Sequence, residues 1–216
     1  IDGVFCLVFR PGDPNTIYAG SYNGVNRSTD AGVHWHRWNE GWPDQQWVFW
    51  IDFDPRNPQI MYACSKDGSN EGTGIVNPDG TSLHGTVMKS TDGGKSWFEI
   101  TTGLTRDQEF YKILVNQENG NVLYLATERK GVYISRNAGG SWEPWNEGLT
   151  NLFAGTNKNN VTNTMVFSPD GRYLYLATAG TGVFRRDVHP ELKRPSERLK
   201  RLREQMPRRR VRPLRR

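Results

Sequence analysis

Short apolar stretches separated by turn-forming residues recur throughout residues 1–188. The first stretch, residues 4–9, precedes a Pro-Gly-Asp-Pro turn at 11–14 and is followed by further stretches at 16–19 and 24–27. Such short runs between turns are typical of β-strands, whereas an amphipathic helix would repeat its apolar residues every three or four positions. We therefore predict an all-β protein.

The stretches repeat as one unit of three or four strands. Each unit begins with an apolar strand, turns at Pro, Asn, Asp or Gly, and continues with two further strands. The expected strands are 4–9, 16–19, 24–27 and 35–38 in the first unit, 48–53, 60–63, 85–89 and the residues after Trp97 in the second, 110–115, 122–127, 131–134 and the residues from Trp142 in the third, and 161–167, 173–178 and 182–185 in the fourth.

One turn motif joins the third and fourth strands of the first three units. It reads Ser, any residue, Asp or Asn, any residue, Gly, two more residues and Trp, at 28–35, 90–97 and 135–142. The Asp or Asn oxygen can accept hydrogen bonds from backbone N–H groups two or three residues later, Gly adopts angles that other residues avoid, and Trp buries a large apolar area. We expect a structural role for its defining residues: Ser28, Asp30, Gly32, Trp35, Ser90, Asp92, Gly94, Trp97, Ser135, Asn137, Gly139 and Trp142.

This motif resembles the Asp-box repeat of bacterial neuraminidases, which is also found in sortilin ectodomains, xyloglucanase-type glycoside hydrolases and photosystem II assembly factors. In those families the box is a hairpin turn remote from the catalytic centre. The resemblance therefore implies a fold more directly than a function. It also suggests an extracytoplasmic or secreted location.

The spacing of the boxes favours a β-propeller. The boxes are 62 and then 45 residues apart, and the 17 extra residues fall near 66–84 in the second unit. Propeller blades of four strands repeat about every 40–50 residues, and a two-sheet sandwich explains this period less well. We predict four antiparallel blades with approximate limits 1–42, 43–105, 106–150 and 151–188. Because the fourth unit has neither a box nor a fourth strand, we expect an incomplete last blade and a segment of a larger propeller.

Charge is distributed unevenly along the chain. The net charge is +5, but residues 193–216 alone contribute +10, which leaves −5 on residues 1–192. We expect residues 189–216 to form a basic tail that is partly helical or disordered. Two interpretations stay open: a solvated terminal segment, or non-specific attachment to an anionic partner such as nucleic acid, acidic lipid or acidic polysaccharide.

Several kinds of site are excluded by spacing. The sequence contains no P-loop, dinucleotide fingerprint, zinc motif or Ser-His-Asp arrangement, so we expect neither a cofactor nor a metal. No apolar run is long enough to span a membrane as a helix. Cys6 and Cys64 lie in expected strands without a metal or redox spacing, which favours buried free thiols.

Strand alternation divides the loops of a propeller between two faces. The turns between first and second strands share one face with the boxes. The loops between second and third strands share the other, here called the loop face, with the links between blades. Exposed Trp beside carboxylates suits the recognition of sugars, although Trp42 and Trp47 could instead pack between blades. The candidate binding residues on the loop face are Trp42, Asp44, Trp47, Asp67, Glu71, Asp79, Asp107 and Glu109.

Two functions stay open. Xyloglucanase-type relatives place their catalytic acids at the open ends of inner strands, and the positions that resemble these are Phe5, Phe49, Tyr111 and Asn163, none of which is an acid. We therefore expect a non-catalytic scaffold that binds carbohydrate or protein. The alternative is a fragment of a xyloglucanase- or sialidase-like glycoside hydrolase, with catalytic acids upstream or on the loop face. The sequence does not identify catalytic residues.

Overall fold

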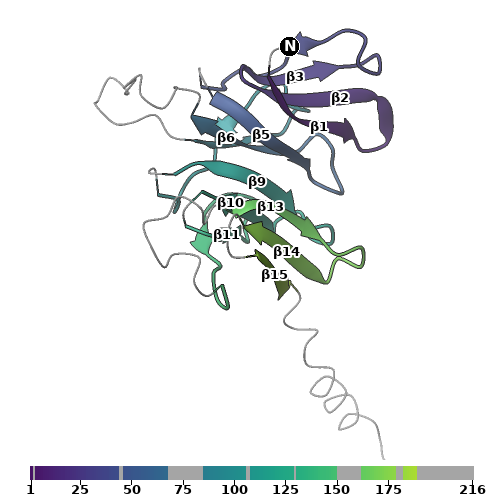
Figure 1. Cartoon of the computed structure of the whole chain (residues 1–216). Coiled ribbons are helices and arrows are strands. Elements are labelled where there is room, and N and C mark those ends of the chain that lie inside the picture. The colour runs from purple at the N-terminus through teal and green to yellow at the C-terminus, as the bar shows by residue number, and fades with distance from the viewer. Residues whose placement is uncertain are drawn as a thin grey trace, which may run out of the picture.

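The computed structural model describes residues 1, 3–43, 46–67, 85–105, 108–128, 130–149, 162–178 and 182–188. This part of the chain contains strands and no helix (Figure 1), and so no helix that is long and apolar enough to cross a membrane. The expected basic tail and most of the expected insertion lie outside the described residues.

The strands form four antiparallel sheets, each ordered as in the sequence. Short connections favour the pairing of most consecutive strands, whereas β6 and β7 pair although residues 68–86 separate them in the sequence. The sheets contain, in turn, β1 (Val4–Arg10), β2 (Asp13–Ser21), β3 (Gly24–Ser28) and β4 (His36–Arg37); β5 (Gln46–Phe53), β6 (Met61–Asp67), β7 (Val87–Ser90) and β8 (Phe98–Glu99); β9 (Phe110–Val115), β10 (Leu123–Thr127), β11 (Val132–Ser135) and β12 (Glu143–Pro144); and β13 (Thr162–Phe167), β14 (Tyr173–Thr178) and β15 (Gly182–Asp187).

The sheets follow one another as the blades of a propeller. The first strand of each blade contacts the first strand of the next, in the order β1, β5, β9 and β13. In Figure 1 the blades run as an arc from β1–β3 to β13–β15, and the described residues do not close a ring. The prediction of an all-β propeller segment with an incomplete last blade is confirmed, since three strands are described in the fourth sheet.

The fourth strand of each complete blade is shorter than expected. β4, β8 and β12 have two residues each, whereas the sequence predicted 35–38 as one strand. Hydrogen bonding nevertheless continues past each strand, because the backbone N–H of Trp38 donates to Val25 and that of Ile100 to Val87. Ile100, after β8, belongs to the core between the second and third blades, and Trp145, after β12, packs against the core between the third and fourth.

The three box turns share one hydrogen-bond pattern. In the first, the Ser28 hydroxyl donates to Asp30 Oδ1 (2.7 Å) and accepts from the Gly32 N–H (2.9 Å), while Asp30 Oδ1 accepts from the His34 N–H (2.8 Å). The second and third boxes repeat these contacts through Ser90 and Ser135. The Asp or Asn Oδ1 therefore accepts from an N–H four residues later, not two or three as expected. The nearer N–H, that of the box Gly, donates to the Ser hydroxyl instead.

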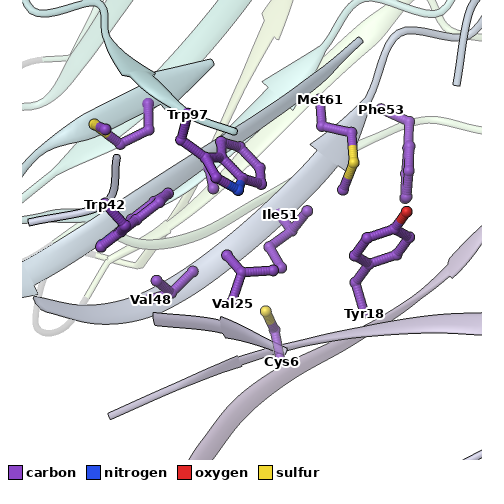
Figure 2. Packing of buried hydrophobic residues seen from close by; sticks show 11 residues of the cluster. Cys6, Tyr18, Val25, Trp42, Val48, Ile51, Phe53, Met61 and Trp97 are labelled. Carbon is purple, nitrogen blue, oxygen red and sulfur yellow. The ribbon is translucent and has the colours of Figure 1, made fainter. Parts of the chain in front are cut away.

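The box tryptophans do not all have the same environment. Trp97 and Trp142 are buried, at 4% and 5% exposure. Figure 2 shows Trp97 between Trp42 and Met61 in the core shared by the first two blades. Trp35 is only partly buried, contrary to the expectation that each box Trp enters a core, because no blade among the described residues covers its side of the first sheet.

The cysteines match their prediction. Cys6 and Cys64 are both buried free thiols. Burial raises the pKa of the Cys6 thiol to about 11 and also raises that of Cys64. Both side chains therefore act as small apolar residues of the inter-blade core.

Candidate functional site

Every inner strand carries a β-bulge near its first residues. The register of β1 jumps from Val4 to Cys6 opposite Ser21 and Gly20, so Phe5 is the extra residue. The same shift sets apart Phe49 in β5, Tyr111 in β9 and Asn163 in β13. A bulge leaves one residue out of the ladder and re-aims its side chain. Four equivalent bulges therefore mark one position around the propeller, at the loop-face ends of the inner strands.

Aromatic rings gather at three of these bulges. Phe5 stacks on Phe49 with ring centres 4.5 Å apart, and Phe49 meets Tyr111 edge to face at 5.3 Å. Trp47 lies 5.8 Å from Phe5 and 4.6 Å from Tyr22. We call these five residues the aromatic cluster. The tip of the β2–β3 turn, Tyr22, is 40% exposed, while the other four rings are half-buried.

A charged pair borders the aromatic cluster. Glu109 Oε2 lies 3.1 Å from Lys66 Nζ and accepts a hydrogen bond from the Tyr111 hydroxyl (3.3 Å). Burial raises the pKa of Glu109, and the negative charge of Glu128 raises it further, whereas Lys66 lowers it. The Glu128 backbone N–H donates to the Glu109 carbonyl (2.9 Å), which keeps the two residues adjacent. The cluster thus has an apolar body and one hydrogen-bonding edge.

Of the candidate residues from the sequence, two belong to this site. Trp47 is part of the aromatic cluster and Glu109 borders it. Trp42 is buried at 8% exposure and packs edge to face on Trp97, 5.2 Å away, as the alternative interpretation of that residue had it. Asp67 ends β6, but its side chain is not described, and the remaining candidates lie outside the described residues: Asp44, Glu71, Asp79 and Asp107.

Sequence reasoning missed part of this site. Phe5, Phe49 and Tyr111 were noted because they are not acids, and their mutual contact was not foreseen. Tyr22 was not considered, and Lys66 was considered only as the first residue of the expected insertion. The available signal was the recurrence of an aromatic residue at one position of three aligned inner strands.

The described site has no arrangement for a metal ion. Within the described ranges, no group of three or more His, Cys, Asp or Glu side chains is close enough to hold one. What the arrangement can do is to present ring faces and edges to a ligand, with Glu109 and Lys66 as hydrogen-bonding groups.

Comparisons with known proteins identify the fold only. No protein-family model matches the chain, and a search of curated proteins gives no match. Among solved structures, an ancestral GH74 enzyme is similar over 87% of this chain with a TM-score of 0.62 and 23% identity. The GH74 xyloglucanase of Xanthomonas campestris is similar over 85% with a TM-score of 0.60 and 18% identity.

A third solved structure is also similar to this chain. YCF48 bound to D1 peptide matches 88% of this chain with a TM-score of 0.52 and 15% identity. The chain spans 25% and 28% of the length of the two GH74 proteins and 56% of that of YCF48. These similarities support a propeller fold, and at such identities they do not transfer an activity.

Proposed function

We propose that this chain is a non-catalytic propeller segment that serves as a binding or assembly scaffold, and that its aromatic cluster contacts a carbohydrate or protein ligand. The bulges carry this proposal. At the inner-strand position where xyloglucanase-type relatives place acids, they present Phe5, Phe49 and Tyr111. These rings can contribute contact area and stacking but cannot transfer a proton in the manner of a carboxylic acid.

The chemistry of the cluster suits ligands with apolar faces and hydroxyl or amide edges. The apolar face of a sugar ring or an aromatic peptide side chain would lie against the exposed parts of Phe5, Trp47 and Tyr22. Glu109 and Lys66 would then hydrogen-bond its polar edge. An extracytoplasmic location is part of the proposal, and an extracellular domain from B. thetaiotaomicron with the same fold is consistent with it (TM-score 0.57, 14% identity).

The test is a binding measurement with a matched pair of variants. Calorimetry of the full chain with xyloglucan oligosaccharides, sialyllactose and a panel of Trp- or Tyr-containing peptides should find a ligand class. For that class, Phe49→Ala should weaken binding at least tenfold. Phe98→Ala removes an equally large but separate ring, 50% exposed on β8, and should leave binding unchanged. Equal effects of both changes would contradict a site at the aromatic cluster.

Glycoside hydrolysis is the second candidate function. The observation that favours it is Glu109, whose pKa is raised by burial and by Glu128 and which accepts a hydrogen bond from Tyr111. A carboxyl with a raised pKa can act as a general acid. Incubation with xyloglucan and sialosides separates the candidates: turnover that Glu109→Gln abolishes would establish the hydrolase, whereas binding without turnover supports the scaffold.

A further inference from the structure

The last blade has the register of the complete blades but lacks their box. In the second sheet Met61 pairs with Ser90, the residue that begins the box. In the fourth sheet Leu174 pairs with Arg186 at the corresponding position. Arg186 therefore stands where a box would start.

Each buried box Trp docks on a segment that follows the fourth strand of the preceding blade. The Trp97 N–H donates to the Glu40 carbonyl (2.8 Å), and its Nε1 donates to the Trp38 carbonyl (3.2 Å). Trp142 repeats both contacts with the second blade, where its N–H donates to Thr102 and its Nε1 to Ile100. These residues belong to related segments, Trp-Asn-Glu-Gly-Trp at 38–42 and Ile-Thr-Thr-Gly-Leu at 100–104.

A third such segment, Trp-Asn-Glu-Gly-Leu at 145–149, receives an arginine instead. Arg186 Nη1 donates to the Trp145 carbonyl (3.0 Å), the atom equivalent to the acceptors of Trp97 and Trp142. Its guanidinium lies 3.9 Å from the centre of the Trp145 ring, and Nη2 is 3.1 Å from Glu147. The guanidinium thus takes over the donor role of an indole but not its apolar volume.

An apolar pocket remains beside Arg186. The core cluster that contains Trp97 includes Val25, Trp42 and Met61, which Figure 2 labels. Ala63 and Met88 belong to the same cluster, and Trp38 packs against it. The equivalent positions at the last blade line the pocket: Val132, Trp145, Leu149, Leu174, Leu176 and Phe184. The pocket therefore corresponds to the site that a box Trp fills elsewhere in this chain.

Next to this pocket, β15 is the outermost strand of its sheet among the strands that the structure describes. In the complete blades the third strand pairs with a two-residue fourth strand, whereas among the described residues the fourth sheet ends at β15. Val183 on β15 is 71% exposed. An unpaired edge is a template for a further strand.

We propose that β15 accepts an extended strand from a partner protein, and that a Trp of this strand occupies the pocket beside Arg186. The expected partner motif is Trp-x-x-Trp or Trp-x-x-Ile, as in residues 35–38, 97–100 and 142–145 of this chain. Residues 189–216 contain no Trp, Tyr or Phe, so this stretch does not supply the side chain. This surface is separate from the aromatic cluster and does not depend on the function proposed for it.

Arg186 must leave the Trp145 ring when the strand binds. Its partner Glu147 is 91% exposed, so the ion pair can move outward into solvent at small cost. The incoming indole then regains the Trp145 carbonyl as acceptor. Burial of the ring in an apolar pocket supplies the driving force.

The test uses the full chain and a labelled synthetic peptide with the sequence of residues 90–100. A twin peptide carries Ala in place of Trp. Fluorescence polarisation should show the Trp peptide binding at least tenfold more tightly than its twin. Arg186→Trp fills the pocket from within and should weaken peptide binding at least tenfold, whereas Arg185→Ala, an exposed neighbour on the same strand, should leave it unchanged.

Hydrogen exchange and the oligomeric state of the chain provide two further tests of the proposal. Hydrogen exchange should show the β15 amides protected by the Trp peptide even if Arg186→Trp fails to fold. Equal binding of the two peptides, absence of binding, or undiminished binding to folded Arg186→Trp would overturn the proposal. Self-association of the wild-type chain that Arg186→Trp abolishes would do so as well, since a second copy would then be the occupant.

Discussion

The indole Nε1 of Trp97 donates to two carbonyls, that of Gly94 within its own turn (2.7 Å) and that of Trp38 on the preceding blade (3.2 Å). One side chain therefore fixes both a box turn and the boundary between two blades. Trp35, at the same position of the first box, donates to Gly32 in its own turn (2.9 Å), and no described blade lies on its other side. Trp35 and Trp97 therefore both stabilise their own turns, and Trp97 also joins two blades, because a described blade precedes it.

This difference predicts unequal effects of truncating the two residues. Trp97→Ala should lower the free energy of unfolding by roughly 3–5 kcal/mol, because it removes a buried ring from a packed core. Trp35→Ala should lower it clearly less, because that ring is already partly in solvent. Urea unfolding of both variants measures the difference. Equal losses would show that packing between the blades adds nothing to the turn.

A second prediction concerns the residue before each box Gly. Ala31 and Ala138 have φ values of 57° and 56°, in the left-handed region, where the second box has Gly93 at 74°. A side chain with a Cβ costs about 1 kcal/mol or more in this region, and Gly removes that cost while giving the unfolded chain more freedom. Ala31→Gly should therefore raise the free energy of unfolding by roughly 0.5 kcal/mol.

The control for this prediction is the reverse change. Gly93→Ala would place a Cβ 2.5 Å from Gln59 Oε1 at an unfavourable φ, so it should destabilise the chain. Thermal unfolding of the two variants should shift the melting temperature in opposite directions. Destabilisation by Ala31→Gly would mean that the added conformational freedom of the unfolded chain outweighs the relief of backbone strain in the folded chain.

The box turns could be predicted from the sequence because their contacts are local. The hydrogen bonds that Ser28 and Asp30 donate or accept join residues no more than four positions apart, so the motif alone specifies them. The repeat then determines the order of the strands, and short turns favour the pairing of most neighbouring strands. The same reasoning could not separate Trp42 from Trp47, since the burial of Trp42 depends on Trp97, far away in the sequence.

The contacts within the aromatic cluster were hard to predict for a different reason. Phe5, Phe49 and Tyr111 come from three inner strands that are more than forty residues apart in the sequence, and each bulge interrupts the two-residue alternation from which side-chain directions are predicted. The position of Arg186 at the start of a missing box can be read by alignment. Its stacking on Trp145 follows only from how the last two blades pack.

The basic tail gives a prediction that rests on its sequence. The +10 balance of residues 193–216 should make the full chain bind heparin and duplex DNA at low salt and release them steeply as salt rises. Removing residues 193–216 leaves a body of net charge −5, which should elute early from both columns. Identical elution of the two chains would show that the tail is not a binding element.

The last prediction concerns a carboxyl that joins two inner strands. Asp52 Oδ2 on β5 accepts a hydrogen bond from the Val115 N–H on β9 (2.8 Å), and Oδ1 accepts one from the Phe53 N–H (2.9 Å). Burial nevertheless raises the pKa of Asp52 from 3.8 to about 6, although these bonds and the charge of Lys112 lower it. The folded chain therefore holds this proton more tightly than the unfolded chain does.

The sign of the pH effect follows from that shift. Stability from protonated Asp52 is fully present below about pH 4 and is lost as the pH rises through about 6, by roughly 3 kcal/mol in total. Asp52→Asn keeps an acceptor for the Val115 N–H and removes the titration. The free energy of unfolding of the variant, relative to wild type, should therefore increase between pH 4 and pH 7.

Asp30 provides a control of opposite sign. Hydrogen bonds from the His34 N–H and the Ser28 hydroxyl lower the pKa of this exposed carboxyl, so its contribution is present at neutral pH and lost in acid. The third box already carries Asn137 at this position, which makes Asp30→Asn a mild change. As the pH rises from acid to neutral, the free energy of unfolding relative to wild type should decrease for Asp30→Asn and increase for Asp52→Asn. Parallel pH profiles of the two variants in urea unfolding would show that burial does not govern the Asp52 carboxyl.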